Sequence, residues 1–182
     1  MTDDPRAQTP DTLVDRAEND RLEAGYAYQP GDAPAYWNFG TYWRLLAASD
    51  NTDGRSTTFD ELFPRGIVAP PHVHDYAEEA FFVLEGDLVF TLGEDDQEIT
   101  APPGTYVYIP PGTRHSFRCG SQVGRVYNTL VPGGFDHGIT AHGITAPQVD
   151  MPAPGTSALT VWQQIVPGRP PVPWEDPDVA SW

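Results

Sequence analysis

Four side chains in the middle of the chain have the types and the spacing of metal ligands. His72 and His74 are separated by one residue, Glu79 follows the polar turn 75–78, and His115 lies further along. Residues two apart in a strand point to the same face, so His72 and His74 can reach one ion together. A hairpin can return Glu79 to their side, whereas His115 has to arrive from a separate strand. Three imidazoles and one carboxylate suit a divalent first-row metal, and they do not select among Mn, Fe, Co, Ni, Cu and Zn.

Two longer patterns contain these residues. The first consists of Gly66, His72, His74, Glu79 and Gly86, and the second of Gly104, Pro110, Gly112 and His115. With every interval kept, they resemble the two signatures of the cupin superfamily. The second signature ends on Asn, where this chain has Cys119. That position is not a metal ligand in the family, so the departure concerns a local turn. The resemblance covers about residues 42–132 and implies that His72, His74, Glu79 and His115 are the ligands.

Two acidic neighbours compete for the fourth ligand position. Glu79 keeps the spacing of the signature and shares strand parity with Phe81 and Val83, so it is expected to face the barrel interior with them. Glu78 would then point the other way. His137 and His142 lie in the doubled motif HGITA and could cap the mouth of the barrel or supply a second metal site. Loop histidines without a paired carboxylate or cysteine are more often ordinary surface residues.

Short apolar runs interrupted by Gly and Pro predict the elements that position these ligands. The strands are expected at 37–47, 57–63, 66–74, 80–84, 87–92, 97–100, 105–109, 115–119 and 124–131. Many short strands at such intervals favour an all-β sandwich or barrel, and a jelly roll satisfies the pattern. The cupin resemblance implies the same fold, a jelly-roll barrel or double-stranded β-helix. The residues at the two ends of the chain add a short N-terminal helix and extended arms on both sides.

The chain is expected to form one domain with an arm on either side. Residues 1–36 are an N-terminal arm with a short helix at about 10–22, residues 37–135 are the barrel, and residues 136–182 are a loop and a Pro-rich arm. Val161 and Trp162 suggest one more strand or a docking contact within that last segment.

Composition limits the partners. The net charge is −16, from 26 acidic and 10 basic residues, and such a surface disfavours nucleic acid and anionic membranes. Cys119 is the single cysteine, which excludes an internal disulfide. The N-terminus lacks the character of a signal peptide and no apolar run reaches membrane-spanning length, so we expect a cytoplasmic protein. The exposed edges of a small barrel and the Pro-rich arms predict a homodimer.

Within the superfamily, the amino-acid sequence around these four residues looks most like that of the quercetinase-like group. That resemblance implies a dioxygenase that opens flavonols with loss of carbon monoxide, with small-molecule substrate and O2 as partners and Glu79 as the general base. Candidates for a flat aromatic pocket are Tyr76, Phe81, Tyr108 and Phe117. Two alternatives stay open, a cupin isomerase, epimerase or lyase acting on a sugar or small acid, and a non-catalytic cupin that binds a small molecule.

Overall fold

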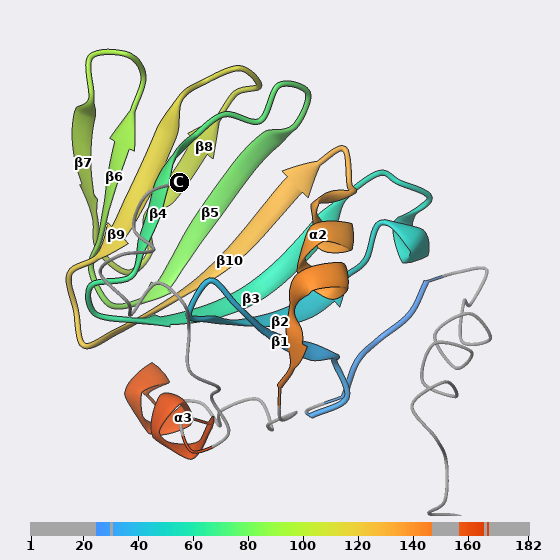
Figure 1. Ribbon diagram of the computed structural model, residues 1–182. Helices are drawn as coiled ribbons and strands as arrows, with labels where there is room; N and C mark the ends of the chain where they lie inside the picture. The colour runs from blue at the N-terminus through green and yellow to red at the C-terminus, as the bar shows by residue number, and fades with distance from the viewer. Residues whose placement is uncertain (1–24, 30, 147–156, 166, 168–182) are drawn as a thin grey trace, which may run out of the picture.

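The fold consists of two facing antiparallel sheets. The computed structural model describes residues 25–29, 31–146, 157–165 and 167 of the 182-residue chain. Within them, one sheet has seven strands in the order β11-β1-β2-β3-β10-β5-β8 and the other has four in the order β4-β9-β6-β7. Figure 1 shows the two sheets meeting along one side and diverging toward the other.

The strands coincide closely with the apolar runs of the sequence. Those of the larger sheet are β1 Ala35–Asn38, β2 Thr41–Ala47, β3 Thr57–Pro64, β5 Glu78–Glu85, β8 Tyr106–Ile109, β10 Val123–Val131 and β11 Ile144–Thr145. Those of the smaller sheet are β4 Val68–His72, β6 Leu88–Leu92, β7 Gln97–Ala101 and β9 His115–Cys119. Strands that follow one another in the sequence often lie in different sheets, as in a jelly roll, and the predicted all-β class is confirmed.

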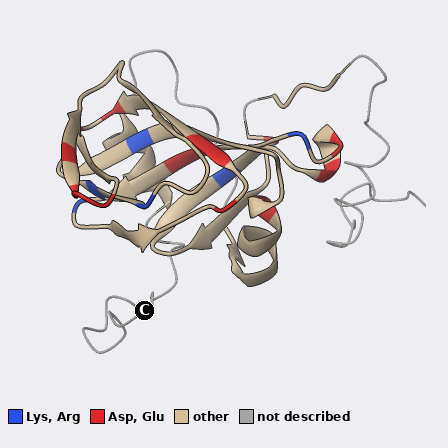
Figure 2. Cartoon of the chain, turned by 90° about the horizontal axis from the view of Figure 1, so that it is seen from above, with Lys and Arg blue, Asp and Glu red and all other residues tan. Residues whose placement is uncertain are grey.

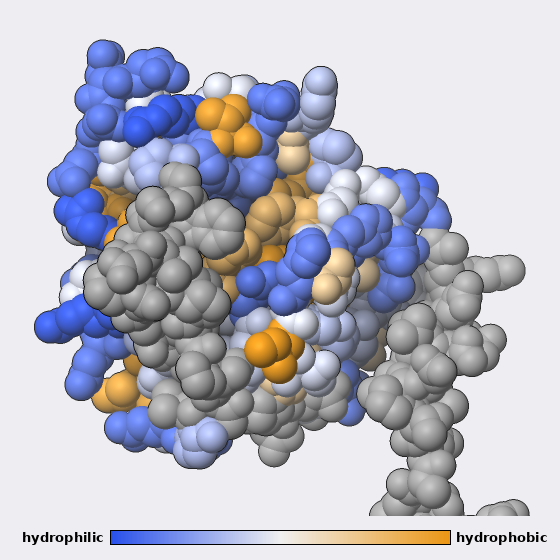
Figure 3. Space-filling model, viewed as in Figure 1, coloured by the Kyte–Doolittle hydropathy of each residue, from blue (hydrophilic) through white to orange (hydrophobic). Residues whose placement is uncertain are grey.

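The main core lies between the sheets. Strict alternation on β5 turns Glu79, Phe81 and Val83 inward, and all three are buried. Phe81 packs against Phe90 of β6 and Phe117 of β9, with ring centroids 5.1 and 5.3 Å apart. These contacts join the two sheets across the barrel. In Figure 3, apolar residues are visible in the middle of this face, with hydrophilic residues around them.

The outer face of the larger sheet carries a buried ionic cluster. Asp60 of β3 contacts Arg44 of β2 and Arg125 of β10, the latter through two hydrogen bonds of 2.9 and 2.7 Å. Figure 2 shows basic and acidic residues on neighbouring strands of this region. Because Arg44 and Asp60 are almost completely buried, pairing is what makes their charges tolerable there.

The segment after the barrel is helical where the sequence predicted a loop. Helix α2 spans Phe135–His142, and helix α3 spans Ala158–Ile165. The prediction of a further strand around Val161 and Trp162 is therefore wrong. In α3 both side chains are buried against Trp37, Tyr42 and other residues of the larger sheet, so the docking contact is correct. Helical spacing places Ala158, Val161, Trp162 and Ile165 on one apolar face, a pattern that a short window between prolines obscures.

Some expectations lie outside the described residues. These are the N-terminal helix at about 10–22 and the Pro-rich end beyond residue 167. The connection between β2 and β3 contains the short 3-10 helix η1, Asp50–Thr52. No helix in the described ranges is long and apolar enough to cross a membrane.

The tight corner at Gly86 gives a test of the packing between strands. Gly86 has a positive φ of 77°, and an added Cβ would lie 2.5 Å from the carbonyl oxygen of Val123. Gly93 has a similar φ of 74° with open space around it. We expect Gly93→Ala to lower the free energy of unfolding by about 1–2 kcal/mol through backbone strain. Gly86→Ala should cost about 1–3 kcal/mol more through the clash.

Urea unfolding of both variants measures the difference directly. Equal stabilities for the two variants would contradict the close approach at Gly86.

Candidate metal centre

The structure brings His72, His74, Glu79 and His115 together between the sheets. His72 ends β4, His74 follows it, Glu79 lies on β5 and His115 begins β9. One ligand atom from each lies within 4.8 Å of the others. Glu79 and His115 are buried, whereas His72 and His74 are half-buried. A small molecule would therefore reach the cluster from the side of His72 and His74.

Strand pairing sets the positions of the histidines. β4 and β9 are antiparallel neighbours with His72 directly opposite His115, and their ring centroids are 4.2 Å apart. The ring of His74 lies 4.9 Å from that of His72 and 5.4 Å from that of His115. The pairing of β4 with β9 shifts register between Ala69 and His72, next to Pro70 and Pro71, which lack the N–H that a regular ladder needs.

Backbone carbonyls fix the tautomers of two rings. Nδ1 of His72 lies 2.7 Å from the carbonyl oxygen of Pro70, and Nδ1 of His115 lies 2.8 Å from that of Thr113. A carbonyl only accepts, so each Nδ1 carries the proton and donates it. The Nε2 atoms are left for the centre of the cluster. Such bonds to the far nitrogen are typical of metal-ligating histidines.

Glu79 is held by three neighbours. Its Oε2 lies 2.9 Å from Nε2 of His115 and 3.4 Å from Nε2 of His74, and its Oε1 accepts a 2.9 Å hydrogen bond from Nδ2 of Asn128. Burial alone would raise the pKa of Glu79, but the Nε2 atoms of His115 and His74 beside its Oε2 outweigh that effect and lower the pKa to about 2. The side chain is therefore a carboxylate at neutral pH.

The atoms of the cluster fit a cation. Glu79 Oε2 and His115 Nε2 are both lone-pair donors when unprotonated, so their 2.9 Å approach needs a proton or a metal ion. Nε2 of His74 is buried and makes no hydrogen bond of acceptable geometry. Burial lowers the pKa of His72, which favours the neutral imidazole that binds metal. Three imidazoles and a carboxylate, each aimed at one point, are the donor set of a divalent first-row metal.

Phe135, the first residue of α2, was missed by the sequence reasoning. Its ring lies 5.6 Å from that of His74 at an interplanar angle of 85°, and it also contacts Trp43 and Phe59. An aromatic residue after the two glycines at 133 and 134 was the available signal, but nothing in the spacing placed it beside His74.

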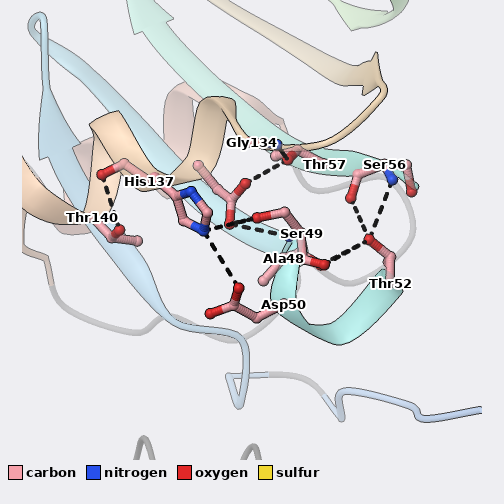
Figure 4. A network of polar contacts seen from close by, with 10 residues as sticks. Ala48, Ser49, Asp50, Thr52, Ser56, Thr57, Gly134, His137 and Thr140 are labelled. Carbon is pink, nitrogen blue, oxygen red and sulfur yellow. Dashed lines mark hydrogen bonds and ion pairs between the residues drawn. The ribbon is translucent and has the colours of Figure 1, made fainter. Parts of the chain in front are cut away.

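A polar network anchors α2 to the barrel. Asp136 accepts hydrogen bonds from the backbone N–H and hydroxyl of Ser49 and a 2.6 Å bond from the hydroxyl of Thr57. Figure 4 shows this network, with Nε2 of His137 beside the hydroxyl of Ser49 at 3.1 Å and Asp50 at 3.4 Å. Burial alone would raise the pKa of Asp136, but the bonds from Thr57 and Ser49 lower it. His137 thus has a place in this anchor, and no second metal-binding group is found among the described residues.

The four aromatic residues predicted to line a substrate pocket lie in different parts of the fold. Phe81 and Phe117 lie in the core below the ligand cluster, on the inward faces of β5 and β9. Tyr76 is 86% exposed in the turn before β5 and is not enclosed by the barrel. Sequence spacing identified inward strand positions but could not fix the direction of a turn residue.

Tyr108 lies on the wrong face for the predicted pocket. It pairs with Ala80 on the outer side of the larger sheet, and its hydroxyl donates a 2.6 Å hydrogen bond to Glu78. Together with Phe82, Tyr106 and Tyr127 it lines a shallow outer hollow of about 260 Å³. The same parity that turns Glu79 inward turns Glu78 and Tyr108 outward, so the sheet separates Tyr108 from the ligand cluster.

Comparison with known proteins fits this geometry. Residues 59–128 match the family described as the cupin domain. This part of the chain is similar to a cupin domain. The chain is 33% identical to quercetin 2,3-dioxygenase of Bacillus subtilis (strain 168) over 111 aligned residues. The aligned region makes up 61% of this chain. The chain spans about a third, 32%, of the length of that relative.

Solved structures show the same barrel. KdgF from Halomonas sp. matches with a TM-score of 0.50 at 19% identity, over 56% of this chain and 91% of that one. A predicted oxalate decarboxylase from Thermotoga maritima matches with a TM-score of 0.53 at 14% identity, over 59% and 99%. At these identities the likeness concerns the cupin fold alone, and it confirms the predicted jelly roll.

The neighbouring acids Glu78 and Glu79 provide a matched pair of variants. We expect Glu79→Ala to lower the affinity for a divalent metal at least about 10-fold, because it removes the one anionic ligand of the cluster. Glu78→Ala should leave it unchanged, because Glu78 faces outward. Metal titration of both variants checks this, and retained affinity in Glu79→Ala would overturn the assignment.

Metal binding by this protein should depend on pH. Burial lowers the pKa of His115, but its hydrogen bonds with Glu79 and Thr113 outweigh that and raise the pKa. A metal has to displace the proton on Nε2, so affinity should fall up to about tenfold per pH unit below that raised pKa. Calorimetry in buffers of different ionisation enthalpy should detect proton release. Affinity that is constant between about pH 8 and about pH 5 would contradict this competition.

Proposed function

We propose that this protein is a metal-dependent cupin dioxygenase that opens a flavonol or another enolisable aromatic substrate with O2. The observation that carries the proposal is the convergence of three imidazoles and Glu79 within 4.8 Å, inside a barrel and open on one side. The 33% identity to a quercetin 2,3-dioxygenase supports the choice of reaction. His72, His74, Glu79 and His115 are the proposed metal ligands.

A divalent metal held by these four side chains would polarise an enol or phenol oxygen of the substrate and lower its pKa. First-row ions that take five or six ligands keep positions free beside four protein ligands, which is the property of a catalytic rather than a closed site. Which metal serves this role remains open among Mn, Fe, Co, Ni, Cu and Zn.

Glu79 is the proposed general base. Asn128 holds its Oε1, while its Oε2 faces the histidines. The low pKa of Glu79 depends on His115 and His74, whose Nε2 atoms lie beside its Oε2. A carboxylate that is ionised at neutral pH can accept the hydroxyl proton of a substrate held beside it.

Apolar side chains surround the cluster and would keep water away from the reacting atoms. Phe135 packs on His74 at the half-buried side, and Phe81 and Phe117 lie deeper in the barrel. Low polarity strengthens the electrostatic interactions of the site and favours a flat aromatic guest. A sugar or small acid, the substrate type of the alternative isomerase or lyase, would need polar residues at these positions.

The proposed reaction balances without a further reductant. Both atoms of O2 enter the ring-opened product, and carbon monoxide removes one carbon and one oxygen from the flavonol. Substrate and O2 are therefore the only small-molecule partners that the proposal requires.

Oxygen consumption with quercetin tests the proposal, using metal-free protein reloaded with each candidate metal. We expect uptake and carbon monoxide release with at least one metal, and a loss of at least about 100-fold in Glu79→Gln, which removes the base. Glu78→Gln is the matched control and should keep full activity. Absence of uptake with every metal across a flavonol panel, alongside turnover of a sugar acid under nitrogen, would reject the dioxygenase in favour of the isomerase or lyase.

The homodimer stays a prediction. The cytoplasmic location also stays a prediction, since the strands and helices described above test neither expectation.

A further inference from the structure

A second carboxyl group lies inside the barrel and belongs to no part of the proposed ligand set. Glu61 of β3 is fully buried, and neither of its oxygens has a hydrogen-bond partner among the described residues. It shares the inward face of β3 with Phe59 and Phe63, and it lies opposite Trp43 of β2 and Val126 of β10. Such a side chain is costly to bury unless it is neutral or paired.

Asn128 connects this group to the metal centre. Its strand, β10, runs between β3 and β5, and its Nδ2 donates to Oε1 of Glu79 at 2.9 Å. Val126 pairs with Glu61 and Leu130 with Glu79, so Asn128 is the diagonal neighbour of both acids on the inward face. Its own Oδ1 is buried without a hydrogen-bond partner.

The two oxygens of Glu61 and Oδ1 of Asn128 are unpaired acceptors, and a proton on Glu61 would supply the donor that joins two of them. Two carboxylate oxygens and an amide oxygen can only accept, but a carboxylic acid has one O–H to donate. That O–H can bond to Oδ1 of Asn128, which leaves one Glu61 oxygen unpaired in place of three unpaired acceptors. A buried unpaired acceptor costs about 1–3 kcal/mol, and a buried unpaired charge costs more.

The charges around Glu61 favour its neutral form. Burial is the largest influence and raises the pKa of Glu61 well above its usual range; the Asn128 side chain lowers it, and repulsion from Glu79 and Asp60 raises it further. Asp60 projects to the other face of β3, where it already pairs with Arg44 and Arg125. Among the described residues, the groups that shift the pKa of Glu61 most include no cation.

We propose that Glu61 is a neutral carboxylic acid that donates its proton to Asn128 Oδ1 and thereby fixes the Asn128 amide with its NH2 toward Glu79. Glu61 is then a positioning residue, which acts on the ligand carboxylate through Asn128. Without this donor the amide could rotate and present its oxygen to Glu79, so that two acceptors would face each other. The proposal rests on the proposed role of Glu79 as a metal ligand.

Infrared difference spectroscopy of the full chain tests the protonation state. The metal-free protein near neutral pH should show the C=O stretching band of a protonated carboxylic acid, and Glu61→Gln should remove it. Glu78 is a half-buried acid on the outward face of the same sheet, so Glu78→Gln should leave the band unchanged. A spectrum identical in the wild type and Glu61→Gln would overturn the proposal.

Metal affinity tests the positioning role. Glu61→Gln keeps an N–H donor for Asn128 Oδ1 and should retain wild-type affinity for Zn²⁺, whereas Glu61→Leu removes the donor and should weaken binding about 10–100-fold. A loss in Glu61→Gln as large as in Glu61→Leu, or wild-type affinity in both, would contradict the role. If Glu61→Leu does not fold, wild-type affinity in Glu61→Gln together with the infrared band supports the proposal, and weakened binding overturns it.

The two measurements separate this inference from the proposed function. A wild-type protein that binds no metal would reject the dioxygenase, while the infrared band would still report the proton on Glu61. A protein that binds metal but lacks the band would reject the inference alone.

Discussion

The structure depends on how a carboxylate is kept charged between two sheets. Glu79 is almost completely buried, where an unpaired charge would cost more than most single contacts contribute. Two histidines and Asn128 surround it, and the two histidines reverse the effect of burial on its pKa. Nε2 of His115, which pairs with Glu79 in the metal-free protein, and the nearby Nε2 of His74 are both available to a cation. The site is thus stabilised with or without its metal.

The barrel provides this arrangement through strand pairing and alternation. β4 and β9 place two histidines opposite each other in the smaller sheet, and β5 contributes Glu79 from the larger sheet. The ends of β2 and β3 reach the cluster indirectly, because Ser49 and Thr57 hold Asp136 at the start of α2. That anchor keeps Phe135 beside His74. The geometry of the ligand cluster and the position of α2 therefore depend on the same few strand ends.

Sequence reasoning correctly predicted the features that depend on motif spacing and on the alternation of residues along a strand. The strands, the inward parity of Glu79 and the meeting of His115 with His72 follow from alternation and from long patterns with fixed intervals. Sequence reasoning failed where tertiary contacts determine the secondary structure or the direction of a side chain. Tyr108 occupies an outward position on β8, and α2 and α3 form where Gly and Pro suggested loops. Glu61 and Asn128 carry no motif, so their partnership becomes visible only when β3 and β10 are paired.

X-ray absorption at the edge of the bound metal tests the central claim most directly, because it reports the ligands themselves. In protein reloaded with one equivalent of metal, the account predicts scattering from three imidazoles and one carboxylate oxygen in the first shell, with the imidazole signal reduced by one in His115→Ala. A first shell of oxygen atoms without imidazole scattering, or a spectrum unchanged in His115→Ala, would contradict it.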